Sequence, residues 1–176
     1  MLITKTKLNY PITVEEAKRH ARLDMSYDDD NDIIETNIKV ATQFCENIVN
    51  FDIAKTQNVY IEYEFSSDFI RLKVPNIRRD SSINIQNDSS TYFSIKQTES
   101  FYNCLDIELV DTVIADPIYV TFTTGYDEDC PEIIKQAILL KTCDLYDTER
   151  NSWHSTAIRD DKTFETMLNY YKSYIV

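Results

Sequence analysis

The spacing of apolar residues predicts helices in the first third of the chain. Thr13 and Glu16 stand at the spacing of a capping box, in which each side chain bonds an amide of the first helical turn, so a short helix is expected within 11–24. A longer helix is predicted over 30–50, because apolar residues there recur at intervals of three and four. They are Ile34, Ile38, Ala41, Cys45 and Ile48, with Ile33, Phe44 and Val49 widening the stripe. Asp30 is expected to cap this helix, since negative charge is favoured at the positive end of the helix dipole.

The middle of the chain changes to an alternation of apolar and polar residues, which predicts antiparallel strands over about 57–124. Residues 59–65 and 70–74 predict one hairpin, and residues 83–86 and 91–96 predict a second. The apolar face of the first strand is Val59, Ile61, Tyr63 and Phe65, and its polar face is Tyr60, Glu62 and Glu64.

The helical period returns after Pro131. A wide apolar arc predicts a helix over 131–149 that is packed on several sides. Its residues are Ile133, Ile134, Ala137, Ile138, Leu140 and Leu145. A closing amphipathic helix carries apolar residues at i, i+3, i+4 and i+7, which are Phe164, Met167, Leu168 and Tyr171.

The order of these segments predicts the fold class. Helices over 11–50, strands over 57–124 and helices over 131–176 contain no alternating βαβ units. We therefore predict an α+β fold, mainly a helical bundle with an inserted antiparallel sheet. A chain of 176 residues can bury one sizeable core, so a single domain over 1–176 is expected.

Gly125 is the only glycine of the chain, and it stands between the last predicted strand and the following helix. Glycine reaches positive φ without steric cost, and proline suits a helix start because its missing amide costs little there. Gly125 and Pro131 are therefore predicted to be architectural turn residues with no ligand to hold.

The charge balance excludes some classes of partner. Asp and Glu number 30 against 18 Lys and Arg, a net charge of −12. Such a chain lacks the basic surface that a non-specific nucleic-acid binder or a binder of anionic membranes needs. No apolar run approaches the roughly 20 residues of a membrane span, and we expect no signal peptide.

Candidate chemistry is sparse. The acidic residues of 28–32 begin like a calcium-binding EF-hand loop, but Ile33 and Lys39 stand where that loop needs Gly and Glu. We therefore expect no metal and, without a glycine-rich phosphate loop, no cofactor. One enzymatic alternative stays open, a cleft that uses Cys45 or His154, because a Cys–His pair needs only to meet in space.

Two stretches resemble the head–tail connector (adaptor) proteins of tailed bacteriophages. In residues 11–49 a proline, a Thr-x-Glu-Glu-Ala helix start and a Leu-Asp pair precede an acid-capped second helix. In residues 119–150 a strand, a Gly-Tyr turn and a proline precede a long helix that ends near Tyr146 and Arg150. The final segment is similar to the family's closing helix. The chain departs from the family in the middle, where polar turns replace the expected glycine-bearing hairpin turns.

The resemblance implies a structural virion protein without catalysis, located at the capsid–tail neck and assembled in the cytoplasm of a host bacterium. About twelve copies would form a ring on the portal protein and join the capsid to tail or head-closure proteins. The helix over 131–149 would pack between copies, and duplex DNA would pass through the channel without sequence-specific binding. The closing helix would dock on the portal through Phe164, Met167, Leu168, Tyr171 and Tyr174. An anionic channel would repel DNA phosphates and let the duplex slide. Two other identities stay open: another neck or tail-completion component, or a non-viral protein–protein adaptor.

Overall fold

The computed structural model describes residues 2–62, 65–74, 82–87, 93–101, 104–115, 117–150 and 162–172. The chain divides into two compact units. The sheet unit contains the N-terminal strand and Ala54–Tyr126, and the helix unit contains Tyr10–Ile53 and the described residues after Tyr126. The expectation of a single domain over 1–176 stays a prediction.

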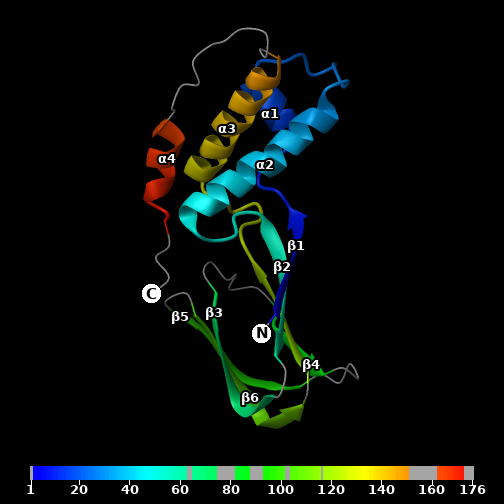
Figure 1. Cartoon of the computed structure of the whole chain (residues 1–176), viewed down its shortest axis with the longest axis vertical. Helices are drawn as coiled ribbons and strands as arrows, with labels where there is room; N and C mark the ends of the chain where they lie inside the picture. Colours follow the sequence, from blue (N-terminus) through cyan, green and yellow to red (C-terminus); the bar gives the residue numbers. More distant parts are fainter. Residues whose placement is uncertain are drawn as a thin grey trace. The chain divides into compact units, whose positions relative to one another are not determined.

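The described residues form seven strands and four helices (Figure 1). The strands are β1 (Leu2–Asn9), β2 (Lys55–Glu62), β3 (Phe65–Lys73), β4 (Asn84–Asn87), β5 (Ile95–Phe101), β6 (Cys104–Ala115) and β7 (Ile118–Thr124). The helices are α1 (Val14–His20), α2 (Asn31–Val49), α3 (Glu132–Arg150) and α4 (Lys162–Asn169).

The prediction of a mainly helical bundle is wrong. The chain is α+β, but its strands occupy about as many residues as its helices, and they form two sheets of their own. The sequence reading missed β1, whose Lys5 and Lys7 interrupt any apolar period. The strands are also not a single insertion between helices. β1 precedes α1 and α2 in the sequence, and it pairs with β2, which follows them.

The predicted hairpins are also wrong. One sheet has the order β1-β2-β7-β4 and the other the order β3-β6-β5, and all pairings are antiparallel. β2 therefore pairs with β1 and β7 instead of with β3, and β4 and β5 lie in different sheets. Alternation reports which side chains share a face of a strand, but it does not identify the strand that pairs with it.

Both sheets contribute to one core in the sheet unit. Its buried members are Tyr60, Ile70, Leu72, Val74, Ile85, Leu105, Ile107, Ile118, Val120 and Phe122. In β2 the inward face is the one expected to face outward, because Thr56, Asn58 and Tyr60 are buried whereas Val59 and Ile61 are half-buried. The Asn58 amide donates to the Thr124 hydroxyl at 2.7 Å, so this buried polar pair is satisfied.

The helix unit is built on α2 and α3, which pack against each other, with α1 and α4 in contact with both. The buried face of α2 carries Ile34, Ile38, Ala41 and Cys45, as the apolar period predicts, but ends with Val49, because Ile48 is half-buried. A helix of 8 residues such as α4 is marginal in isolation, so its contacts with α2 and α3 stabilise it.

Left-handed backbone conformations occur at three described positions, and glycine occupies only one. Gly125 has φ 84°, Arg22 has φ 57° and Asn50 has φ 62°. At the end of α1 the amide of Arg22 donates to the Arg19 carbonyl and that of Leu23 to the Lys18 carbonyl. This is the Schellman motif, in which glycine is the usual residue at the position of Arg22.

Candidate functional site

The apolar arc of α3, which is expected to pack between copies, is largely buried inside the helix unit. Ile134, Ala137 and Ile138 are fully buried, while Leu140 and Leu145 are half-buried. Ile133 is the exception, with 46% of its surface exposed. Within the predicted arc, Ile133 therefore offers the most surface to a partner.

The closing helix α4 contributes to the same core. Leu168 is fully buried and Met167 is half-buried. Beyond the helix, Tyr171 is half-buried and Tyr170 is 89% exposed, with the two rings in edge contact at 5.4 Å. The Phe164 side chain and Tyr174 lie outside the described residues.

The expected capping residues have different roles in α1 and α2. Thr13 caps α1: the Glu16 amide donates to its hydroxyl at 3.2 Å, and its own amide donates to the Glu16 carboxylate at 2.7 Å. Asp30 stands at the N-cap position of α2, but its side chain makes no capping hydrogen bond. Its carboxylate instead accepts a hydrogen bond of 2.5 Å from the Tyr146 hydroxyl, which ties α3 to the start of α2.

The two turn residues also have local explanations. Gly125 is buried and follows β7 with a positive φ that a side chain would oppose. Pro131 directly precedes α3, and its carbonyl accepts from the Lys135 amide at 3.1 Å, the first bond of the helix. Both positions are therefore explained by backbone geometry.

An exposed apolar row on α2 was not recognised as a surface from the sequence. Ile33, Val40 and Phe44 are 42%, 38% and 48% exposed. They stand at i, i+7 and i+11, so they share one side of the helix. The predicted apolar stripe includes Ile33 and Phe44 but not Val40, and which of its side chains stay exposed depends on how the helices pack. We call these three residues the α2 row.

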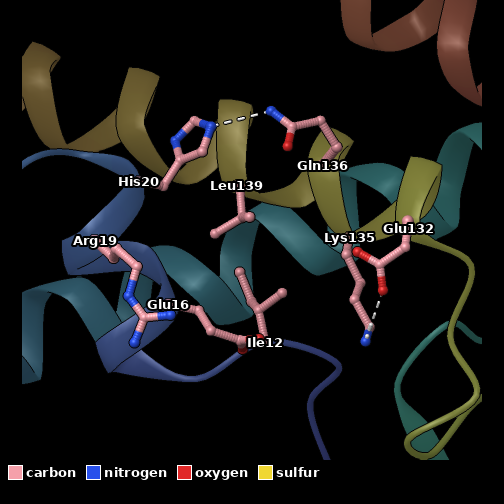
Figure 2. A pocket seen from close by; sticks show the side chains of 8 residues that line it. All are labelled: Ile12, Glu16, Arg19, His20, Glu132, Lys135, Gln136 and Leu139. Carbon is pink, nitrogen blue, oxygen red and sulfur yellow. Dashed lines mark hydrogen bonds and ion pairs between the residues drawn. The ribbon is translucent and has the colours of Figure 1, made fainter.

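A small cavity lies between α1 and α3, as Figure 2 shows, and has a volume of about 260 Å³. Ile12 and Leu139 supply its apolar lining. Its charged lining residues are Glu16, Arg19, Glu132 and Lys135. Equal numbers of acids and bases mean that the cavity favours no particular charge in a ligand.

His20 and Cys143 meet beside this cavity, a juxtaposition that no sequence motif indicated. The Gln136 side-chain amide nitrogen is hydrogen-bonded to His20 Nε2 at 3.0 Å, and His20 Nδ1 is hydrogen-bonded to Cys143 Sγ at 3.3 Å. Burial, and secondarily the Asp147 carboxylate, raises the pKa of the Cys143 thiol. The raised pKa favours the protonated thiol over the thiolate that nucleophilic catalysis needs.

The other candidate nucleophile is no better placed. Cys45 is fully buried, and burial raises its pKa to about 12. His154 lies outside the described residues. Among the described residues no group of His, Cys, Asp or Glu side chains has the arrangement of a metal site, and no described helix is long and apolar enough to cross a membrane.

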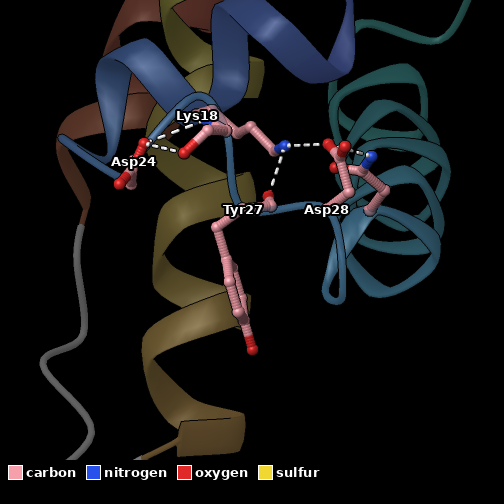
Figure 3. Close-up of polar contacts among 6 residues, drawn as sticks. Lys18, Asp24, Tyr27 and Asp28 are labelled. Carbon is pink, nitrogen blue, oxygen red and sulfur yellow. Dashed lines mark hydrogen bonds and ion pairs between the residues drawn. The ribbon is translucent and has the colours of Figure 1, made fainter.

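A buried cation fixes the loop between α1 and α2 (Figure 3). Lys18 is 3% exposed, and its ammonium donates to the Tyr27 carbonyl at 2.6 Å and to the Asp28 carboxylate at 3.1 Å. The Lys18 and Asn31 hydrogen bonds hold the pKa of Asp28 below its ordinary value. In the same loop, hydrogen bonds from Ser26 lower the pKa of Asp24. The start of α2 is thus held by hydrogen bonds to two other helices: Lys18 of α1 bonds Asp28, and Tyr146 of α3 bonds Asp30.

The fold is shared with proteins of phage-like particles. No model of a known protein family and no curated protein matches the sequence. Three solved chains from gene transfer agent (GTA) particles match over 100% of this chain and 97% of their own length. They come from the neck of an empty particle computed with C6 symmetry (12% identity, TM-score 0.67), the virion of a native particle (11%, 0.69) and the neck of a native particle computed with C12 symmetry (11%, 0.66). At this level of identity the likeness shows the fold.

Proposed function

We propose that this protein is a structural component of the neck of a tailed phage or phage-like particle. It forms a closed ring of about twelve copies that docks on the portal and joins the capsid to the tail. The observation that carries the proposal is the fold shared, over nearly the whole length of both chains, with GTA chains that include components of symmetric necks. The resemblance of residues 11–49 and 119–150 to phage adaptors supports it independently.

The proposed role needs no catalytic group. The Cys143 thiol is hydrogen-bonded and its pKa is raised, and Cys45 is buried. Duplex DNA passes through the ring without being bound, because the summed negative charge of the copies repels phosphates. The location is the virion neck, with assembly in the cytoplasm of the host bacterium.

Native mass spectrometry and negative-stain microscopy test this proposal on the full chain, alone and mixed with its portal protein. We expect a ring of one defined copy number, free or seated on the portal. A chain that stays monomeric at high concentration and also fails to join the portal ring would contradict the proposal.

Portal docking is assigned to the closing segment, with Leu168 as its internal support and the tyrosines as its contact. Tyrosine is enriched among residues that dominate binding energy. Replacing both Tyr170 and Tyr171 with alanine should weaken portal binding at least tenfold in a pull-down titration. Phe69→Ala, which removes an exposed aromatic of the sheet unit, is the matched control. If the double tyrosine variant binds the portal as tightly as Phe69→Ala does, the closing segment is not the docking surface.

A further inference from the structure

The exposed surface of α2 is divided into rows of different polarity. Asp32, Glu35 and Lys39 form a charged row, with Lys39 and Glu35 paired at 2.6 Å. Next around the helix come exposed, uncharged residues, which are Thr36, Gln43 and Asn47. The α2 row, Ile33, Val40 and Phe44, follows, and beyond it lies the buried face.

This succession has the composition of a protein–protein contact. Contact centres are depleted in charge, and a polar rim surrounds them. In a chain with 27% charged residues, six exposed residues without a charge on one side of a helix form an unusual surface. A single exposed apolar residue would need no explanation. Three exposed apolar residues on one side of a helix, bordered by uncharged polar residues, do need one.

Phe44 has the placement of an anchoring residue within this surface. The Lys141 ammonium from α3 lies 5.1 Å from the centre of its ring, which covers part of the ring and restricts its position. Lys141 is itself paired with Asp144 at 3.1 Å. The aromatic side chain is thus held by the neighbouring helix while 48% of it remains accessible.

The net charge decides which partner fits. Two copies of a chain with a net charge of −12 repel each other, so they meet at least electrostatic cost where neither presents charge. A basic partner would instead favour an acidic surface, and nucleic acid or an anionic membrane would favour a cluster of lysines and arginines. The α2 row itself carries no charged side chain, and the Lys141 ammonium beside Phe44 is paired with Asp144. We propose that the α2 row is the surface on which the neighbouring copy packs in the ring, an inference that rests on the proposed function.

Ring closure also constrains the geometry of this contact. Copies in a ring meet through two different patches, head to tail, whereas a two-fold dimer brings one patch against itself. Val40 of one copy therefore faces a different surface of the next copy, and it does not face Val40. This distinguishes the ring contact from a simple dimer through the same helix.

Val40→Glu tests the assignment with Lys39→Gln as the matched control. Both substitutions make the net charge of the chain more negative by one, at neighbouring exposed positions of α2. Val40→Glu does so by adding a negative charge within the α2 row, whereas Lys39→Gln removes a positive charge outside it. We expect Val40→Glu to fold as the parent by circular dichroism and to lose the ring in native mass spectrometry, with and without portal. Lys39→Gln should assemble as the parent does.

The remaining outcomes separate the surface from the function. A parent ring that survives Val40→Glu overturns the α2 row as the contact and leaves the proposed function standing. Efficient disulfide dimers of Val40→Cys would mean that the row meets itself, which overturns a head-to-tail contact. A parent that forms no ring, alone or on portal, overturns both proposals.

Discussion

Arg22 holds a left-handed backbone conformation that glycine adopts at lower cost. A non-glycine residue there carries roughly 1–2 kcal/mol of strain, while glycine adds backbone entropy to the unfolded chain. Arg22→Gly should therefore raise the free energy of unfolding by about 0.5–1 kcal/mol, seen as a higher urea midpoint at unchanged slope. Arg22→Ala, which keeps the strain, is the control. A glycine variant no more stable than the alanine variant would mean that the turn is unstrained.

Gly125 presents the converse case, because its φ of 84° and its burial leave no room for a branched side chain. Gly125→Val should lower the free energy of unfolding by about 1–3 kcal/mol and reduce ring assembly in proportion. Gly125→Asn, a residue that tolerates positive φ, should be milder. A valine variant as stable and as competent in assembly as the parent would show that the turn does not need this conformation.

Asp28 makes the loop before α2 sensitive to acid. The pKa of Asp28 is lower in the folded chain than its ordinary value of 3.8 in the unfolded chain. The ionised carboxyl therefore stabilises the folded state fully at pH values above 3.8, and this contribution is lost as pH falls through the folded pKa. Amide exchange in residues 24–30 should therefore accelerate, relative to α3, only below about pH 4. Asp28→Asn should abolish that acid-dependent component. Its persistence in the variant would assign it to another group, such as Asp24.

At the scale of elements, Leu168 is the residue of α4 that is fully buried among those whose side chains the structure describes. Leu168→Ala should cost about 2–5 kcal/mol of stability, because it leaves a cavity where the side chain is now fully buried. Tyr170→Ala, at an almost fully exposed position, should change stability by less than about 0.5 kcal/mol. Urea denaturation measures both, and similar values for the two would mean that α4 is not anchored by Leu168.

The elements also show what a sequence can specify. The ends of α2 and α3 lie close to the predicted 30–50 and 131–149, because periodicity and capping act within a few turns. Strand partners depend on contacts distant in sequence, so β2 could not be assigned to β1 and β7 from alternation alone. Similarly, the meeting of His20 with Cys143 and the exposure of the α2 row depend on how helices pack, which no local spacing encodes.

For the whole molecule, net charge and the uncharged α2 row predict how assembly responds to salt. Salt screens the repulsion between acidic copies, with a Debye length of about 10 Å at 0.1 M, and it does not weaken an apolar contact. The ring should therefore form at lower protein concentration in about 0.3 M than in about 0.05 M NaCl. Light scattering across a dilution series measures this. Dissociation on adding salt would instead indicate a contact made by ion pairs.

The presence of a single glycine has a consequence for the unfolded chain. A protein of this length usually has about twelve glycines, and each glycine replaced at a compatible position reduces the entropy lost on folding by about 0.4–1 kcal/mol. With one glycine, this chain therefore has an unfolded ensemble restricted on the order of 5 kcal/mol relative to an average composition. Part of the stability of the folded protein thus arises because the unfolded chain has fewer accessible conformations. This part does not correspond to any contact in the folded structure.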